Sequence, residues 1–199
     1  MRIRTLILAL LPLSAMGGEW VLENDYFRVS RDAVQCAQAD ARACIDRVIV
    51  ALAALDLDCG SGLRQLARGD VAVFGDGESY LQPLGGSFLE IVIKPAHPQC
   101  QPPGEWIAAE KNALLHDGGD FIVSEEQLAP GDTRARHSHC QRLVVQLNAT
   151  RLHQWPDGAP EKFVDTVPDL PLFAPAVVHT VNNVGSAPLR GIVVEFKRR

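Results

Sequence analysis

The chain has 199 residues, of which 47% are hydrophobic and 22% are charged, so it can build a core in one large domain or two small ones. Its formal net charge of −5 gives no support to nucleic-acid binding, because nucleic acid attracts a basic surface. The 16 glycines and 13 prolines lie between short strand-like runs, which favours an all-β architecture with many turns.

The first residues have the features of a targeting segment. Arg2 and Arg4 precede the apolar run Leu6–Leu13, and small residues follow it. This order predicts a signal peptide over residues 1–18, and therefore a periplasmic or secreted protein. The alternative interpretation is a buried N-terminal strand or helix. The run is too short to span a bilayer comfortably, so no stable membrane insertion is expected.

Five cysteines bear on disulfide formation, which an oxidising compartment permits. Cys36 and Cys44 flank a short polar segment, and we expect them to form a disulfide. Cys59 and Cys100 are the next candidate pair, which leaves Cys140 as the odd cysteine. An odd number cannot pair completely within one chain, so at least one cysteine is free or bonded to another molecule.

The N-terminal half, residues 19–95, contains several strand-like runs. Tyr26–Ser30 and Phe88–Lys94 are rich in aromatic and β-branched residues, and each predicts a strand. Arg68–Phe74 predicts a turn followed by a strand. In Arg47–Leu57 helix and strand compete, because alanine and leucine favour a helix whereas the Val-Ile-Val sequence favours a strand.

Residues 96–112 contain several prolines and predict a linker, and residues 113–199 form a C-terminal half that repeats the first. Arg142–Leu152 matches Arg47–Leu57 position by position, which indicates that both runs are strands. Three further matches keep the same order along the chain: Asp120–Ser124 with Asp25–Ser30, Phe173 with Phe74, and Leu189–Glu195 with Phe88–Lys94. Two copies of one β unit explain this order most simply.

Three histidines of the C-terminal half are candidates to hold one metal ion. His137 and His139 enter an apolar, β-branched run, and alternate side chains of a strand share a face. His179 lies beside another strand-like segment. Three neutral imidazoles on a β scaffold suit Zn, Fe, Ni or Cu. In the N-terminal copy the matching positions hold other residue types: Arg42, Cys44 and Tyr80.

These residues resemble the cupin family. Gly131–His139 looks like the start of the first cupin motif, and Ala174–Asn183 looks like the end of the second, with His179 and Asn183 at the expected separation. Ile192–Phe196 fits the closing strand. The resemblance implies an all-β fold of two cupin-like β-barrels, of the jelly-roll or double-stranded β-helix type, formed by an internal duplication. It is also compatible with a homodimer.

The resemblance implies a divalent transition metal, Fe, Mn, Ni or Zn, held by His137, His139 and His179 together with a glutamate. The sequence departs from the family at that glutamate, whose place falls on Leu143 or Val144, and neither can bind metal. The missing carboxylate leaves more coordination positions for water. Outside the motif, the residues that can complete the shell are Glu125, Glu126, Cys140 and Gln141.

A small molecule is the expected ligand of such a barrel. Arg136 and Arg142 flank the histidine pair, and either can orient an anionic substrate. Gln141 shares the histidine face if the strand continues, and it is a third candidate for contact with the substrate. No catalytic residue is assigned.

Two hypotheses about function remain. One is an exported metal-dependent enzyme of the dioxygenase, isomerase or hydrolase type, and the other is a non-catalytic bicupin that binds a ligand or serves assembly without metal. The fold does not decide between them, since one barrel hosts many chemistries.

Overall fold

The computed structural model describes residues 19–34, 45–59, 62–75, 78, 83–98, 100 and 111–197. The expected signal peptide, the expected Cys36–Cys44 disulfide and the N-terminal counterparts of the three histidines lie outside these residues. Within them the fold is all-β, as the sequence predicts, and the strand pairs are antiparallel. No helix in this part of the chain is long and apolar enough to cross a membrane.

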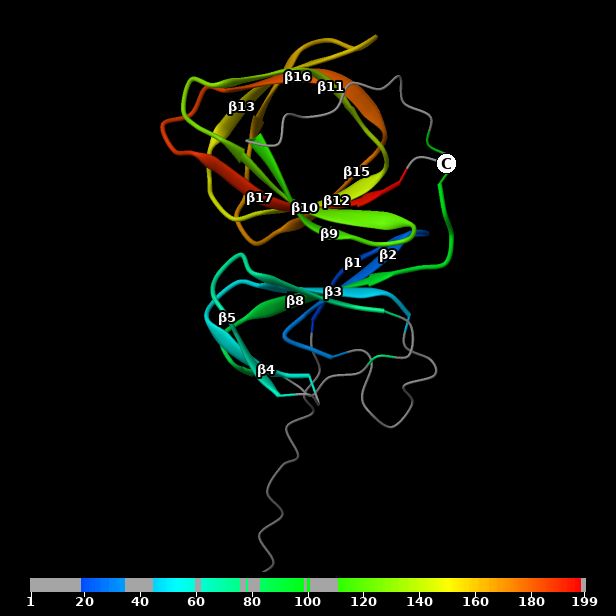
Figure 1. The fold of residues 1–199 in the computed structure, drawn as a ribbon. Coiled ribbons are helices and arrows are strands. Elements are labelled where there is room, and N and C mark those ends of the chain that lie inside the picture. Colours follow the sequence, from blue (N-terminus) through cyan, green and yellow to red (C-terminus); the bar gives the residue numbers. More distant parts are fainter. Residues whose placement is uncertain are drawn as a thin grey trace, which may run out of the picture.

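The described strands divide between two halves. The N-terminal half contains β1 (Glu19–Glu23), β2 (Phe27–Arg31), β3 (Arg47–Ala51), β4 (Leu55–Asp58), β5 (Leu63–Leu66), β6 (Val71–Phe74), β7 (Leu84–Gly85) and β8 (Phe88–Ile93). The C-terminal half contains β9 (Asn112–Asp117), β10 (Phe121–Leu128), β11 (Thr133–His139), β12 (Arg142–Gln146), β13 (Arg151–Pro156), β14 (Lys162–Asp165), β15 (Pro171–Ala174), β16 (Val177–Asn183) and β17 (Leu189–Phe196). Figure 1 shows the C-terminal half, green to red, above the N-terminal half, blue to green.

Among the described strands, each half has one five-stranded sheet, and the strand order is the same in both. The order is β1-β2-β8-β3-β6 in the N-terminal half and β9-β10-β17-β12-β15 in the C-terminal half. The second sheets are β5-β4-β7 and β11-β16-β13-β14. The predicted pair of barrels is therefore confirmed, and their shared strand order is what duplication of one unit produces.

The pairing register corrects one of the sequence matches by a single residue. Arg47 lies opposite Phe74 in the pair formed by β3 and β6. Its counterpart Arg142 lies opposite Ala174, one residue after the predicted Phe173.

The register also corrects the predicted match between the closing strands β8 and β17, in this case by two residues. Phe88 pairs with Ala51, whose counterpart in β12 is Gln146. Gln146 pairs with Gly191 and not with the predicted Leu189. A two-residue offset leaves every side chain on its face, because strand side chains alternate. The closing strand was thus predicted correctly, although its register was wrong.

The two long apolar runs are strands, which decides the competition between helix and strand, but each run forms two of them. Arg47–Leu57 contains β3 and most of β4, and Arg142–Leu152 contains β12 and the start of β13. The two strands of each run belong to different sheets. Each run therefore crosses from one sheet of its barrel to the other.

The five-stranded sheets pack against each other and form a hydrophobic core that both halves share. Leu143 and Val145 of β12 enter this core, and so do Val48 and Val50 of β3. The residues between them point into the interior of their own barrel, so these strands are buried on both faces. Burial on both faces explains why they are nearly continuous hydrophobic runs instead of alternating ones.

Polar contacts fix how the halves meet. Arg68, before β6, donates to the carbonyl oxygen of Leu147 at 2.9 Å and to the carboxylate of Asp169 at 2.6 Å. The neighbouring Gly69 has a φ of 88°, and a Cβ atom there would lie 2.7 Å from Leu147 Cδ1. Glycine is therefore required at this turn both for its backbone conformation and for the close approach of the halves.

A disulfide joins Cys100 to Cys140, whose Cα atoms are 5.5 Å apart, and Cys59 is free. The expected Cys59–Cys100 pair and the unpaired Cys140 are therefore wrong. Cys140 follows the end of β11, and one cavity is lined by both Cys140 and Asn112 at the start of β9. Cys100 and Cys140 are close in space although their sequence separation is 40. The disulfide holds Cys100 beside the histidine pair, because Cys140 directly follows His139.

Candidate metal centre

The three histidines come together inside the C-terminal half. His137 and His139 lie in β11, and His179 lies in β16 opposite His137. All three residues are buried, and one ligand atom from each lies within 4.8 Å of the others. The prediction that they share a face and converge is confirmed.

A β-bulge in β11 aims these side chains. Arg134 pairs with Val181, and a regular register would then place His137 opposite Val178. The register instead shifts by one residue, so that His137 lies opposite His179. An extra residue of this kind turns the following side chains to the other face of the strand. Arg134 and His137 consequently both face the barrel interior although they are three residues apart.

Hydrogen bonds determine which ring nitrogens can bind an ion. His137 Nδ1 lies 2.7 Å from the carbonyl oxygen of Ala135, and His139 Nδ1 lies 2.8 Å from Glu195 Oε2. A carbonyl and a carboxylate only accept, so each Nδ1 carries the proton and each Nε2 offers a lone pair. These two Nε2 atoms are 3.0 Å apart, and His179 Nε2 is buried without a hydrogen-bond partner among the described residues. A cation bound between them would satisfy all three nitrogens, so the residues present fit a metal ion.

Burial keeps the three imidazoles neutral near physiological pH. It lowers the pKa of His137 to about 4 and the pKa values of His139 and His179 to about 2. The positive charge of Arg142 acts in the same direction on all three. Neutral imidazole is the form that binds metal, so these rings need not lose a proton first.

Glu195 of β17 supports the histidine pair from outside the cluster. Its Oε2 accepts the hydrogen bond from His139, and its Oε1 accepts one from the backbone N–H of Cys140 at 2.6 Å. A carboxylate behind a ligating histidine fixes the ring and raises its basicity. Sequence reasoning missed this residue. The signal that could have found it is the alternation of side chains along the closing strand. This alternation places Glu195 on the same face as Gly191, which lies next to Gln146 inside the barrel.

The two places left for the family glutamate point in opposite directions. Leu143 belongs to the core shared by the two halves, whereas Val144 lines the cavity inside the C-terminal barrel. Of the two places, only Val144 therefore faces the cavity that His139 and His179 also line. Two other candidates for the shell have different partners, since Glu125 pairs with Arg190 and Cys140 is in a disulfide.

Glu126 brings a carboxylate into the cavity, but two side chains already hold it. Its Oε2 accepts from Arg134 Nη1 at 3.0 Å, and its Oε1 accepts from Gln146 Nε2 at 3.1 Å. Burial raises the pKa of this carboxyl group, but the adjacent Arg134 outweighs burial and holds the pKa below its usual value. Gly191 makes room for the amide, because a Cβ atom there would lie 2.8 Å from Gln146 Oε1.

Of the three residues predicted to contact a substrate, only Arg142 lines the cavity. Arg136 is exposed and pairs with Asp157, with Nε 3.1 Å from Oδ2. Gln141 follows the end of β11 at His139, so the strand does not continue to place it on the histidine face. The positions of Arg136 and Gln141 therefore do not support their predicted contact with a ligand.

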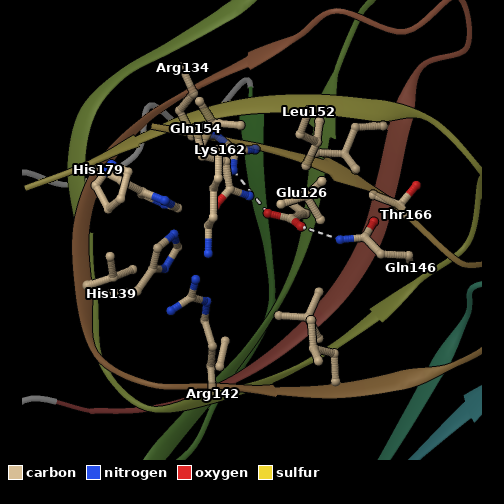
Figure 2. A pocket seen from close by; sticks show the side chains of 18 of the residues that line it. Glu126, Arg134, His139, Arg142, Gln146, Leu152, Gln154, Lys162, Thr166 and His179 are labelled. Atoms are coloured by element: carbon tan, nitrogen blue, oxygen red, sulfur yellow. Dashed lines mark hydrogen bonds and ion pairs between the residues drawn. The ribbon is translucent and has the colours of Figure 1, made fainter. Parts of the chain in front are cut away.

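A cavity of about 380 Å³ lies inside the C-terminal barrel, which is within the size range of small-molecule sites. Figure 2 shows His139, His179 and Arg142 on one side of it, and Leu152 and Thr166 on the other. Sequence reasoning missed most of this lining, because its residues come from eight strands, β10 to β17, and carry no common motif.

Comparisons with known proteins agree with this architecture. No protein-family model matches the sequence, and no curated protein matches it. A Pseudomonas aeruginosa protein described as glyoxylate-induced matches 92% of this chain over 79% of its own, with a TM-score of 0.62 and 12% identity. A cupin 2 conserved barrel domain protein from Leptotrichia buccalis matches 91% of this chain over 88% of its own, with a TM-score of 0.56 and 14% identity.

The Bacillus subtilis oxalate decarboxylase, in a variant form, matches 87% of this chain over 70% of its own, with a TM-score of 0.54 and 10% identity. These matches span both halves, so the chain has the fold of the cupin superfamily, with two cupin-like barrels. At such identities the likeness shows the fold alone, and function has to be argued from the site.

Proposed function

We propose that this protein is a small-molecule-binding metalloprotein in which His137, His139 and His179 hold one divalent transition-metal ion. The observation that carries the proposal is the convergence of three buried imidazoles, with one ligand atom from each within 4.8 Å of the others, together with the buried Nε2 of His179, which has no hydrogen-bond partner among the described residues. Leaving a buried polar atom unsatisfied costs about 1–3 kcal/mol. Metal binding offsets this cost, and the donor set suits Fe, Mn, Ni or Zn.

The cavity supports a role for the ion in ligand binding. Three histidine ligands leave coordination positions open to water or to an oxygen atom of a ligand. His139 and His179 line the cavity, so such positions face its interior. Val144, in place of a carboxylate, leaves one position more.

A metal-dependent enzyme of the dioxygenase, isomerase or hydrolase type is the second candidate function. It is favoured by the combination of open coordination positions with a cavity of small-molecule size that His139 and His179 line. A ligand-binding bicupin without metal is the third hypothesis. It does not explain why Nε2 of His179 is buried without a hydrogen-bond partner among the described residues.

We also propose export to the periplasm or beyond the cell. The signal-like residues 1–18 support it, and so does the Cys100–Cys140 disulfide, because disulfides persist in oxidising compartments. A homodimer stays a prediction, which sedimentation of the purified protein would test.

Elemental analysis of the purified protein tests the metal site. We expect about one Fe, Mn, Ni or Zn ion per chain, and a higher melting temperature when the ion is returned to chelated protein. The His137→Ala/His139→Ala double variant should contain no stoichiometric metal and should show no such rise.

His153→Ala is the matched control, because His153 lies on the same sheet but pairs with Glu161 at the surface. It should keep the metal content of the wild type. Purified protein without metal, combined with a melting temperature that none of the four ions changes, would rule out the proposed function.

A further inference from the structure

We infer that the cavity takes an amphiphilic organic anion, a carboxylate with an apolar body, whose charged end lies beside Arg142 and whose body lies against the apolar wall. This inference deepens the proposed function and rests on it, since the same cavity contains the histidines.

The N-terminal barrel contains a counterpart of Arg142 that has a carboxylate beside it. Arg47 is the counterpart of Arg142 and is 1% exposed, and its Nε lies 3.9 Å from Glu90 Oε1. Its guanidinium also donates to the carbonyl oxygens of Ile45 and Glu78. That barrel therefore contains a buried carboxylate for its own arginine.

The C-terminal barrel lacks this carboxylate. By the strand register, Val193 occupies the position of Glu90. The guanidinium of Arg142 donates to two backbone carbonyl oxygens, those of Pro175 at 3.1 Å and Cys140 at 3.4 Å. Arg142 is only 8% exposed, so bulk water solvates its charge poorly. A buried cation in this position favours an anion from outside.

Glu195 lies opposite Arg142 in the pair formed by β12 and β17, but its carboxylate oxygens accept hydrogen bonds from other groups. Its two oxygens accept from His139 and from the backbone N–H of Cys140. Among the described residues, no carboxylate oxygen lies within 4.0 Å of the Arg142 guanidinium. Glu195 therefore moderates the positive charge of Arg142 from a distance without pairing with it.

The charged residues that line the cavity leave a positive excess. Arg134 is paired with Glu126 at 3.0 Å, and Asp165 faces a surface arginine at 3.7 Å. Arg142 and Lys162 remain, and a bound divalent ion would add further positive charge. The cavity thus attracts an anion over a neutral or cationic ligand of the same shape.

The polar and apolar parts of the cavity are separate, and the apolar part is why we infer an apolar body for the ligand. Across the four-stranded sheet, successive rows facing the barrel carry His137 with His179, then Arg134 with Gln154 and Lys162, then Leu152 with Val164. The remaining wall is built largely from Val144, Val167, Leu170 and Leu172. The last three are 56%, 49% and 59% exposed, so the apolar part of the cavity reaches the solvent. Exposed apolar side chains that line a cavity favour a ligand with an apolar group, because binding removes their surface from water.

Calorimetric titration of the metal-loaded protein with octanoate, octanol and acetate tests the inference. Octanoate should bind, octanol should bind about 10- to 100-fold more weakly because it lacks the charge, and acetate should bind weakly because it lacks the body. Arg142→Gln should weaken octanoate binding about 10- to 100-fold and leave octanol binding unchanged. Arg136→Gln, which removes a surface arginine outside the cavity, should bind all three like the wild type.

Leu172→Asp is a second variant that avoids the buried arginine, since Leu172 is exposed at the cavity. It should weaken octanoate binding about tenfold, because it places a carboxylate against the ligand body. Equal binding of octanol and octanoate, unchanged octanoate binding in Arg142→Gln, or no binding of octanoate at all would overturn the inference.

The metal content of the same samples separates the two proposals. Stoichiometric metal without octanoate binding rejects the amphiphilic anion and leaves the metal site in place. Octanoate binding that depends on Arg142 in a protein that takes up no metal rejects the metal site and supports the anion.

Discussion

Glu195 Oε2 lies 2.8 Å from Nδ1 of His139, and this contact joins the closing strand of the barrel to the histidine pair. The side chains are 15% and 5% exposed, so the hydrogen bond is shielded from water. It keeps the proton of the imidazole on Nδ1 and directs the lone pair of Nε2 toward the other two rings.

Glu195→Gln should therefore lower the affinity for Zn²⁺ about 10- to 100-fold, because an amide is a weaker acceptor and brings no negative charge. Competition with a chelating dye measures this affinity. Glu161→Gln is the control, since it removes the carboxylate of a surface pair with His153. Equal zinc affinity in Glu195→Gln and wild type would contradict a supporting role for Glu195.

Val144→Glu should restore a fourth ligand. Val144 lines the same cavity as His139 and His179, so a carboxylate at this position enters that cavity. One added negative charge near a divalent ion should raise the affinity for Mn²⁺ or Fe²⁺ at least about tenfold. Val144→Gln is the control of similar size without the charge. If Val144→Glu binds Mn²⁺ no better than Val144→Gln does, then Val144 does not occupy the ligand position.

The stability of the metal-free protein should depend on pH through the three histidines. Burial lowers the pKa of His137 to about 4 and those of His139 and His179 to about 2, well below the usual value near 6.5. Between pH 6.5 and 4 the unfolded chain therefore binds more protons than the folded one. The free energy of unfolding should decrease as pH falls through this range, by up to about 1.4 kcal/mol per histidine per pH unit.

Urea denaturation of chelated protein at several pH values measures this dependence. The His139→Asn/His179→Asn double variant should show a shallower slope than the wild type. A free energy of unfolding that stays constant from pH 6.5 to 4 would show that the imidazoles are not held neutral.

Removal of the Cys100–Cys140 disulfide should destabilise the protein by about 2–4 kcal/mol, because it releases a loop with a sequence separation of 40. Guanidinium denaturation of the Cys100→Ser/Cys140→Ser variant measures this loss. Cys59→Ser, which changes a free thiol, should stay within about 1 kcal/mol of the wild type. A double variant as stable as Cys59→Ser would indicate that the disulfide adds nothing to stability.

The sequence predicts those parts of the site that follow strand periodicity. His137 and His139 share a face because they are two residues apart, and the motif spacing brought in His179. The bulge that lets Arg134 face the same interior breaks this periodicity, so that residue was missed. Cys140 shows the same limit, since its disulfide partner Cys100 is 40 residues away in the sequence and no periodicity connects the two.

The contents of the cavity were harder to predict than the barrel around it. Arg142 and Arg47 align in sequence, but only the strand register shows that Val193 takes the position of Glu90, the buried glutamate that pairs with Arg47. Lys162 comes from a strand with no motif and reaches the site through its pairing with Gln154. Such residues are identified by their neighbours in space, which a single sequence does not give.

The core between the two five-stranded sheets holds the halves together even at low protein concentration. Each half buries one full sheet face against the other, as two subunits of a dimer would. A dimer dissociates on dilution, because its stability depends on the concentration of its protomers. Here one chain contains both halves, so the association is intramolecular and the barrel with the histidines keeps its partner at any dilution. The N-terminal barrel has none of the three histidines at the matching positions, but the protein still requires it, because its sheet covers the apolar face of the C-terminal barrel.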